Sequence, residues 1–360
     1  MDALAQRLSL DAKVARRLEG AARCLGGLDT LSRAWPPWQG FAYYVLPALA
    51  AKAELELAGD DLDLADLLAL GPEPAPNRPN HTLRRAVGVI LAWRRLEAWP
   101  QDSPLTPSLV TEILPLLDAP HLARTPSHST PESPGPAPGA PVWSLAPRWV
   151  QGGLPPLWAA GLALATWERE GPDHPNRSLA GRALLCGLAP RLGLPAQAFC
   201  GLGAWLSQAA QEHSLQLGTL IKQVRRTGAW RRFMEVFLTA VEKGAGRVRD
   251  ISLQAQELEF SHQELVDTWV RAPRHPQRLL ALLVRRPVLD VPSVAEQLEV
   301  TQRTAGLLLQ KLKDLGLVKE ITGQSRGRRF AYIPLLEILQ PGWDRRGHED
   351  DQGPENGDQL

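Results

Sequence analysis

Four consecutive residues, Thr301-Gln-Arg-Thr304, have side chains that can hydrogen-bond to the edges of nucleic-acid bases. They stand at the start of a predicted helix that runs to Leu315 with leucines on one face. Thr301 is expected to cap this helix, and Gly316 follows where a left-handed residue ends one. The spacing therefore predicts a helix with a polar first turn and an apolar inner face.

Basic residues around this helix have the chemistry to contact phosphates. They are Lys311 on the helix itself and Arg326, Arg328 and Arg329 in a predicted hairpin further along the chain. From residue 271 to residue 333 there are 12 Lys and Arg against 5 Asp and Glu, a net charge of +7. The whole chain carries only +1, so the rest of it is about −6. A basic module on an acidic body is typical of a DNA-binding protein.

The elements predicted to position these residues have the order of a winged helix-turn-helix. An apolar helix over 278–286 stops at Pro287, and Ser293 is expected to cap a short helix over 294–298. After the helix that starts at Thr301, the segments 318–321 and 329–333 alternate as two strands of a wing hairpin. In such folds the third helix enters the major groove of DNA.

Length and composition indicate a cytoplasmic protein of two or three domains. The chain has 360 residues, of which 44% are hydrophobic, and no uninterrupted apolar run is long enough to cross a membrane. The start of the sequence lacks the pattern of a signal peptide. Three cysteines without a C-x-x-C spacing are expected to be reduced structural thiols, and we expect neither a metal site nor a cofactor.

Helical periodicity covers most of the chain outside the basic module. We expect a helical region over 1–125, a Pro-rich loop over 126–142 and a helical core over 143–272. The winged helix-turn-helix would then occupy 273–340, and a polar, acidic segment over 341–360 is expected to be disordered. Within the core, one helix is expected over 204–226, and the tryptophans are expected to pack on apolar helix faces.

Two stretches resemble the Fic family, helical enzymes that transfer AMP from ATP to protein hydroxyls. Residues 221–237, with Arg226-Thr-Gly-Ala-Trp230, are similar to a turn of the family written RxTGDW, and residues 278–339 resemble the winged helix that closes many such chains. Weaker similarities lie at 26–29, at 54–68 and at Pro120-His-Leu-Ala-Arg-Thr125. The resemblance implies a mainly α fold, a Fic-like helical bundle followed by the winged helix-turn-helix.

The catalytic loop of the family, HPFxxGNGRxxR, is degenerate in this sequence. A gapless reading after Trp167-Glu168 puts Gly171 at the catalytic His, Arg177 at the metal-binding Asn and Arg182 at the last Arg. A second reading, shifted by three residues, puts His174 at the catalytic His and needs an insertion. It leaves Leu179-Ala180 where the family has Gly-Asn, a pair that holds phosphate and metal.

Both readings imply that AMP transfer is lost or severely reduced, because a general base or a phosphate-binding turn is missing. The family's inhibitory segment, SxxxEG, would fall on residues 54–59, with Ala58 at its Glu. We therefore favour a non-catalytic DNA-binding transcriptional regulator, a pseudoenzyme that binds double-stranded DNA and is expected to form a homodimer. One alternative is a divergent Fic-type nucleotidyltransferase using His174 and Arg182. Another is a protein-interaction or antitoxin-like module.

Overall fold

The structure is a computed structural model that describes residues 12–70, 81–101, 103, 105–118, 141–228, 230–269, 274–323 and 327–341. These residues form helices almost throughout, with one small sheet, so the prediction of a mainly α chain is confirmed. The chain divides into two compact units that interleave along the sequence. The first comprises residues 1–36, 46–62 and 72–250, and the second comprises 37–45, 63–71 and 251–360.

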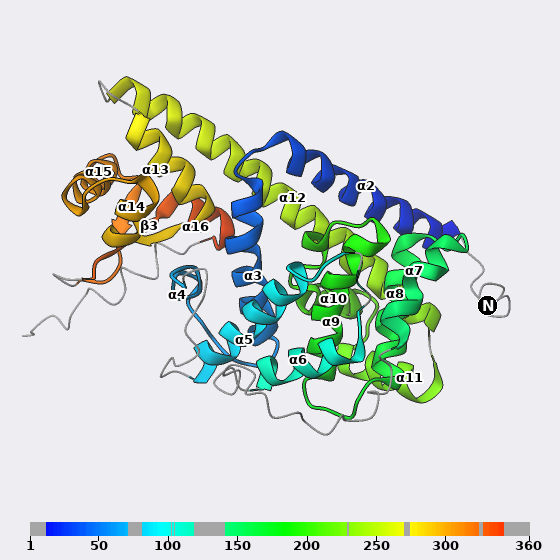
Figure 1. Ribbon diagram of the computed structural model, residues 1–360. Helices are drawn as coiled ribbons and strands as arrows, with labels where there is room; N and C mark the ends of the chain where they lie inside the picture. Colours follow the sequence, from blue (N-terminus) through cyan, green and yellow to red (C-terminus); the bar gives the residue numbers. More distant parts are fainter. Residues whose placement is uncertain are drawn as a thin grey trace, which may run out of the picture. The chain divides into compact units, whose positions relative to one another are not determined.

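The first unit is a bundle of helices. They are α2 (Ala12–Ala34), most of α3 (Trp38–Glu56), α5 (His81–Glu97), α6 (Pro107–Asp118), α7 (Pro141–Gln151), α8 (Pro156–Glu170), α9 (Arg177–Leu188), α10 (Leu202–Glu212), α11 (Leu217–Thr227) and the first half of α12 (Trp230–Trp269). Two short 3₁₀ helices, η2 (Ala189–Leu192) and η3 (Ala196–Phe199), follow α9. Helix α8 packs against α7, α9 and α11, and α9 packs against α5 and α6 (Figure 1).

Aromatic residues fill the centre of this bundle. Phe237 stacks on Phe199 and on Phe233, with ring centroids 6.4 and 6.3 Å apart respectively. Trp143 and Trp167, both buried, lie with their ring centroids 5.7 Å apart. Among the described residues, six tryptophans are buried, which confirms core packing for these, and all but Trp38 belong to the first unit: Trp35, Trp38, Trp93, Trp143, Trp158 and Trp167.

The second unit contains α4 (Leu64–Leu68), the rest of α3 and α12, and the carboxyl-terminal elements. These last are α13 (Arg274–Arg285), β1 (Val288–Asp290), α14 (Val291–Leu298), α15 (Gln302–Asp314), β2 (Val318–Glu320), β3 (Arg329–Tyr332) and α16 (Ile333–Leu339). The antiparallel sheet has the order β1-β3-β2. Leucines of α13 and α15 are buried, as are Phe330 and Tyr332 of β3.

Three details differ from the prediction. The cap of α14 is Asp290, whose carboxylate accepts from the Ser293 backbone N–H at 2.8 Å, so Ser293 as N-cap was wrong. Pro292, which suits the first turn of a helix, allows α14 to start earlier than predicted. The single helix expected over 204–226 is two helices, because Ser214 adopts a left-handed backbone conformation with φ of 56°. The strand β1 was not predicted.

Some predictions lie wholly or partly outside the described residues. Residues 126–140 of the predicted Pro-rich loop lie outside them, and α7 begins at Pro141. Residues 342–360 of the segment predicted to be disordered also lie outside them. Within the described residues, no helix is both long and apolar enough to span a membrane.

Candidate functional site

Helix α15 begins with a side-chain cap that fixes the geometry of its first turn. The Thr301 hydroxyl accepts from the Thr304 backbone N–H at 3.2 Å, and the two threonine hydroxyls lie 2.9 Å apart. Thr301 is therefore the N-cap, as predicted. Because both hydroxyls already bond within the turn, the groups free to reach outward are the exposed side chains of Gln302 and Arg303.

The two faces of α15 differ in character. Ala305, Leu308, Leu309 and Leu312 are buried on the inner side. The exposed residues of α15 are Gln302, Arg303, Leu307, Gln310, Lys311, Lys313 and Asp314, and Gly306 is half-buried. The part that we call the outer face of α15 comprises Gln302, Arg303, Gly306, Leu307 and Lys311. Within the described part of the chain, no carboxylate lies within ion-pair distance of Arg303 or Lys311. Both cations therefore remain available to a ligand of negative charge.

The remaining predicted cations belong to the β2–β3 hairpin, and the two that the structure describes differ in exposure and contacts. Arg328 is exposed, with its guanidinium 5.7 Å from the Phe330 ring centroid and 3.8 Å from the Glu320 carboxylate. Arg329 is the first residue of β3, half-buried and paired in register with Asp290. Arg326 lies outside the described residues. Of the two described arginines, Arg328 is the more available for a phosphate contact.

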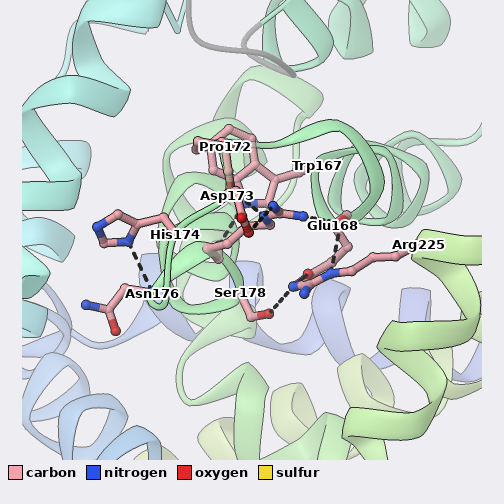
Figure 2. Close-up of polar contacts among 9 residues, drawn as sticks. Trp167, Glu168, Pro172, Asp173, His174, Asn176, Ser178 and Arg225 are labelled. Carbon is pink, nitrogen blue, oxygen red and sulfur yellow. Dashed lines mark hydrogen bonds and ion pairs between the residues drawn. The ribbon is translucent and has the colours of Figure 1, made fainter.

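The loop between α8 and α9, where the catalytic loop was placed by resemblance, is held by Glu168 (Figure 2). The Glu168 carboxylate is 3% exposed and accepts from the Arg225 Nη2 at 2.8 Å. Arg225 also donates to the Glu168 carbonyl at 3.1 Å and to the Ser178 hydroxyl at 3.4 Å. The guanidinium of Arg225 thus ties α11 to both ends of the loop.

Arg177 is used inside the same loop. It donates to the backbone carbonyls of Glu168, at 3.2 Å, and of Pro172, and it pairs with Asp173 at 3.3 Å. The Arg177 carbonyl in turn accepts from the Trp167 indole N–H at 2.8 Å. This guanidinium thus closes the loop on itself.

His174 has both ring nitrogens engaged. Its Nδ1 accepts from the Asn176 backbone N–H at 3.1 Å, which places the ring proton on Nε2 in the neutral form (Figure 2). Nε2 lies 3.0 Å from the Asp118 carboxylate, and Asp118 also accepts from the Asn176 side chain at 2.7 Å. A general base needs a free lone pair toward its substrate, and here the Nδ1 lone pair is already occupied.

Arg182 forms a buried, two-pronged ion pair with Glu54 of α3. Its Nε donates to the Glu54 Oε1 at 2.9 Å, and the two side chains are 12% and 7% exposed. The Gly203 backbone N–H donates to the same carboxylate oxygen at 3.0 Å. Glu54 therefore accepts from both Nε and Nη2 of the Arg182 guanidinium.

Two glycines of the loop region are explained by tryptophan packing. A Cβ on Gly181 would lie 2.3 Å from Cδ1 of Trp167, and one on Gly171 would lie 2.6 Å from the Trp167 carbonyl oxygen. Both positions thus need glycine because Trp167 packs closely against them. In the described ranges of the chain, no cluster of His, Cys, Asp and Glu has the arrangement of a metal site.

Comparison with known proteins identifies the carboxyl-terminal module. Residues 276–331 match the family model described as "HTH DNA binding domain", which covers α13 to most of β3. The module is a helix-turn-helix domain. The match includes every residue for which the sequence predicted a DNA contact, from Thr301 to Arg329.

A more remote likeness extends over most of the chain. Among solved structures, the chain is similar to a Fic family protein from Desulfovibrio desulfuricans G20, with 11% identity and a TM-score of 0.40. The similarity covers 90% of this chain and 97% of that one. At this identity and TM-score no residue role follows from the likeness. Among curated proteins, none matches the chain.

Sequence reasoning missed several residues that shape these sites. No pattern in the sequence points to Glu54 as the partner of Arg182 or to Asp118 as the partner of His174. For Gly306 and Leu307 the sequence predicts only that they belong to the third helix. A signal was present for Leu307, because it lies off the apolar stripe of Leu308 and Leu312.

Proposed function

We propose that this protein is a non-catalytic, DNA-binding transcriptional regulator that reads duplex DNA through α15. Gln302 and Arg303 would contact base edges in the major groove, and Thr301 and Thr304 would fix the turn that presents them. Lys311, Arg326, Arg328 and Arg329 would contact phosphates, with the β2–β3 hairpin acting as a wing. The observation that carries the proposal is the exposed Arg303 on the outer face of a helix-turn-helix domain, for which the described part of the chain supplies no ion-pair partner.

The contacts of the α8–α9 loop support a body without transferase chemistry. Arg177, Arg182 and His174 all make their polar contacts within the protein. We therefore propose that the first unit is a Fic-like pseudoenzyme scaffold. If so, radiolabelled ATP incubated with the protein and a cell lysate leaves no label on any polypeptide. Label transferred by the wild type and lost in His174→Ala would establish the transferase alternative instead.

Charge-removing variants of the helix-turn-helix domain test the DNA proposal. Arg303→Ala is expected to reduce the preference between duplexes, because a bidentate contact to guanine discriminates by about 1–3 kcal/mol. Arg328→Ala is expected to weaken all duplexes about equally and to reduce the salt slope by about 1. Arg33→Ala removes the same charge from α2, at an exposed pair with Asp29, and serves as the matched control.

Binding is measured by fluorescence anisotropy on a specific and a random duplex. If Arg303→Ala and Arg328→Ala both bind like Arg33→Ala, the assignment of α15 and the hairpin as the DNA surface is wrong. A stable protein partner together with salt-independent, negligible DNA binding would favour the interaction-module alternative.

A further inference from the structure

An exposed apolar side chain lies in the middle of the basic outer face of α15. Leu307 is 58% exposed, whereas Leu308, Leu309 and Leu312 of the same helix are buried. It follows Arg303 by one turn and precedes Lys311 by one turn, so all three share one stripe. The stripe is thus cationic at both ends and apolar at its centre.

The glycine beside Leu307 has no structural reason to be glycine. Among the described residues, a Cβ built on Gly306 meets nothing within 4 Å, and Gly306 is not one of the described glycines with a positive φ. Glycine inside a helix is less stable than alanine there. The absence of a side chain at this position therefore benefits only a binding partner that approaches the α15 backbone closely.

We infer that Gly306 and Leu307 form a thymine-reading pair within the DNA surface of α15. Gly306 lets the helix backbone approach the floor of the major groove, and Leu307 contacts the C5 methyl group of a thymine. That methyl group is the one apolar group that a base edge presents in this groove. The inference rests on the proposed function, since it requires that α15 lies in the major groove of duplex DNA.

Charge favours DNA over an apolar protein surface as the occupant. The cations Arg303 and Lys311 flank Leu307, and the amino-terminal end of α15 carries a partial positive charge. An apolar protein patch would leave both cations to be desolvated without partners, whereas DNA supplies base acceptors and phosphates for them. The arrangement therefore suits a thymine flanked by guanine or phosphate acceptors.

Replacement of thymine by deoxyuridine tests Leu307 directly, because it removes only the C5 methyl group. A duplex bound by the wild type is selected from a random pool, and each thymine is replaced in turn. One replacement is expected to weaken wild-type binding by about fourfold, the effect of one buried methyl group. Leu307→Ala is expected to bind the thymine and deoxyuridine duplexes equally. Leu253→Ala, at a 47% exposed leucine of α12, should keep the full difference.

Gly306→Ala separates contact with DNA from stability of the fold. The melting temperature is expected to stay unchanged or to rise by about 1–3 °C, since alanine is the better helix former. DNA binding is expected to weaken by about tenfold, because the added methyl group overpacks a close contact. Gly26→Ala is the control, because a Cβ on this exposed glycine of α2 also meets no described atom within 4 Å. It should raise stability and leave DNA binding unchanged.

The outcomes distinguish this inference from the proposed function. If the wild type binds the selected duplex but no deoxyuridine replacement matters, or Leu307→Ala keeps the difference, thymine reading by Leu307 is refuted and DNA binding stands. If Gly306→Ala binds DNA like the wild type, the close approach is refuted. If the wild type selects no duplex at all, the proposed function fails first. Loss of a self-associated species in Leu307→Ala, with DNA binding intact, would assign Leu307 to a protein interface and overturn the inference.

Discussion

Removing one partner of the buried ion pair between Arg182 and Glu54 is expected to destabilise the first unit strongly. In Arg182→Met the Glu54 carboxylate, only 7% exposed, keeps the Gly203 N–H but loses its counter-charge. Breaking such a pair costs about 3–5 kcal/mol, because an unpaired charge remains in a poorly solvated place. At about 2–4 °C per kcal/mol, the melting temperature should fall by roughly 10 °C.

The double variant Arg182→Met with Glu54→Leu removes both charges together. Its remaining cost is mainly the Gly203 N–H left without an acceptor, about 1–3 kcal/mol. Glu54→Leu alone leaves both the Arg182 guanidinium and that N–H unsatisfied, so it should be at least as harmful as Arg182→Met. The double variant should therefore be more stable than either single variant, with a coupling energy of about 2 kcal/mol or more.

Urea unfolding of the full chain, followed by tryptophan fluorescence, measures these free energies. Several tryptophans are buried in the first unit, so their emission reports its unfolding. If the free energy of unfolding of Arg182→Met is within about 0.5 kcal/mol of the wild-type value, the pair stabilises the protein no more than a surface ion pair does. That result would refute the view that Glu54 permanently occupies Arg182, and it would reopen Arg182 as a phosphate ligand.

Further predictions concern the cap, a histidine and the thiols. Thr301→Ala should lower the free energy of unfolding by about 1 kcal/mol through loss of the N-cap, measured by urea unfolding against Thr301→Ser, which should retain most of it. His262 lies 2.7 Å from the Tyr332 hydroxyl, and burial lowers the pKa of His262, so the unfolded chain binds that proton more readily. The melting temperature should therefore fall as the pH drops from the ordinary histidine pKa of about 6.5 through the lowered pKa of His262. His262→Gln should make this fall smaller, and an equal fall in both proteins would contradict the assignment. Burial raises the pKa of both the Cys186 and the Cys200 thiols, so neither should react with a thiol reagent at neutral pH unless urea is added.

The carboxyl-terminal elements could be predicted because local signals agree with one another there. The Thr301 cap, the leucine stripe and Gly316 bound α15, and alternation marks the two strands that follow. Local signals were ambiguous at the start of α14, where both Asp290 and Ser293 are good caps. Pro292 favours the earlier start, since its ring suits the first turn. The strand β1 was missed because three residues are too short for a periodic pattern.

The α8–α9 loop could not be predicted in the same way, because its contacts join distant parts of the chain. Arg182 and Glu54 are 128 residues apart, and Arg225 and Glu168 are 57 apart. Neither pair leaves a periodic trace in the sequence, so only the three-dimensional packing brings them together. The need for glycine at 181 likewise becomes visible only when Trp167 is seen against α9.

The central claim is that the full chain binds duplex DNA specifically through its helix-turn-helix domain. The most direct test is its affinity for a random duplex and for its own upstream region at several salt concentrations. About four phosphate contacts predict a slope of roughly −3 to −4 in log affinity against log salt, with tighter binding to the upstream duplex. Negligible binding that does not change with salt would contradict the claim.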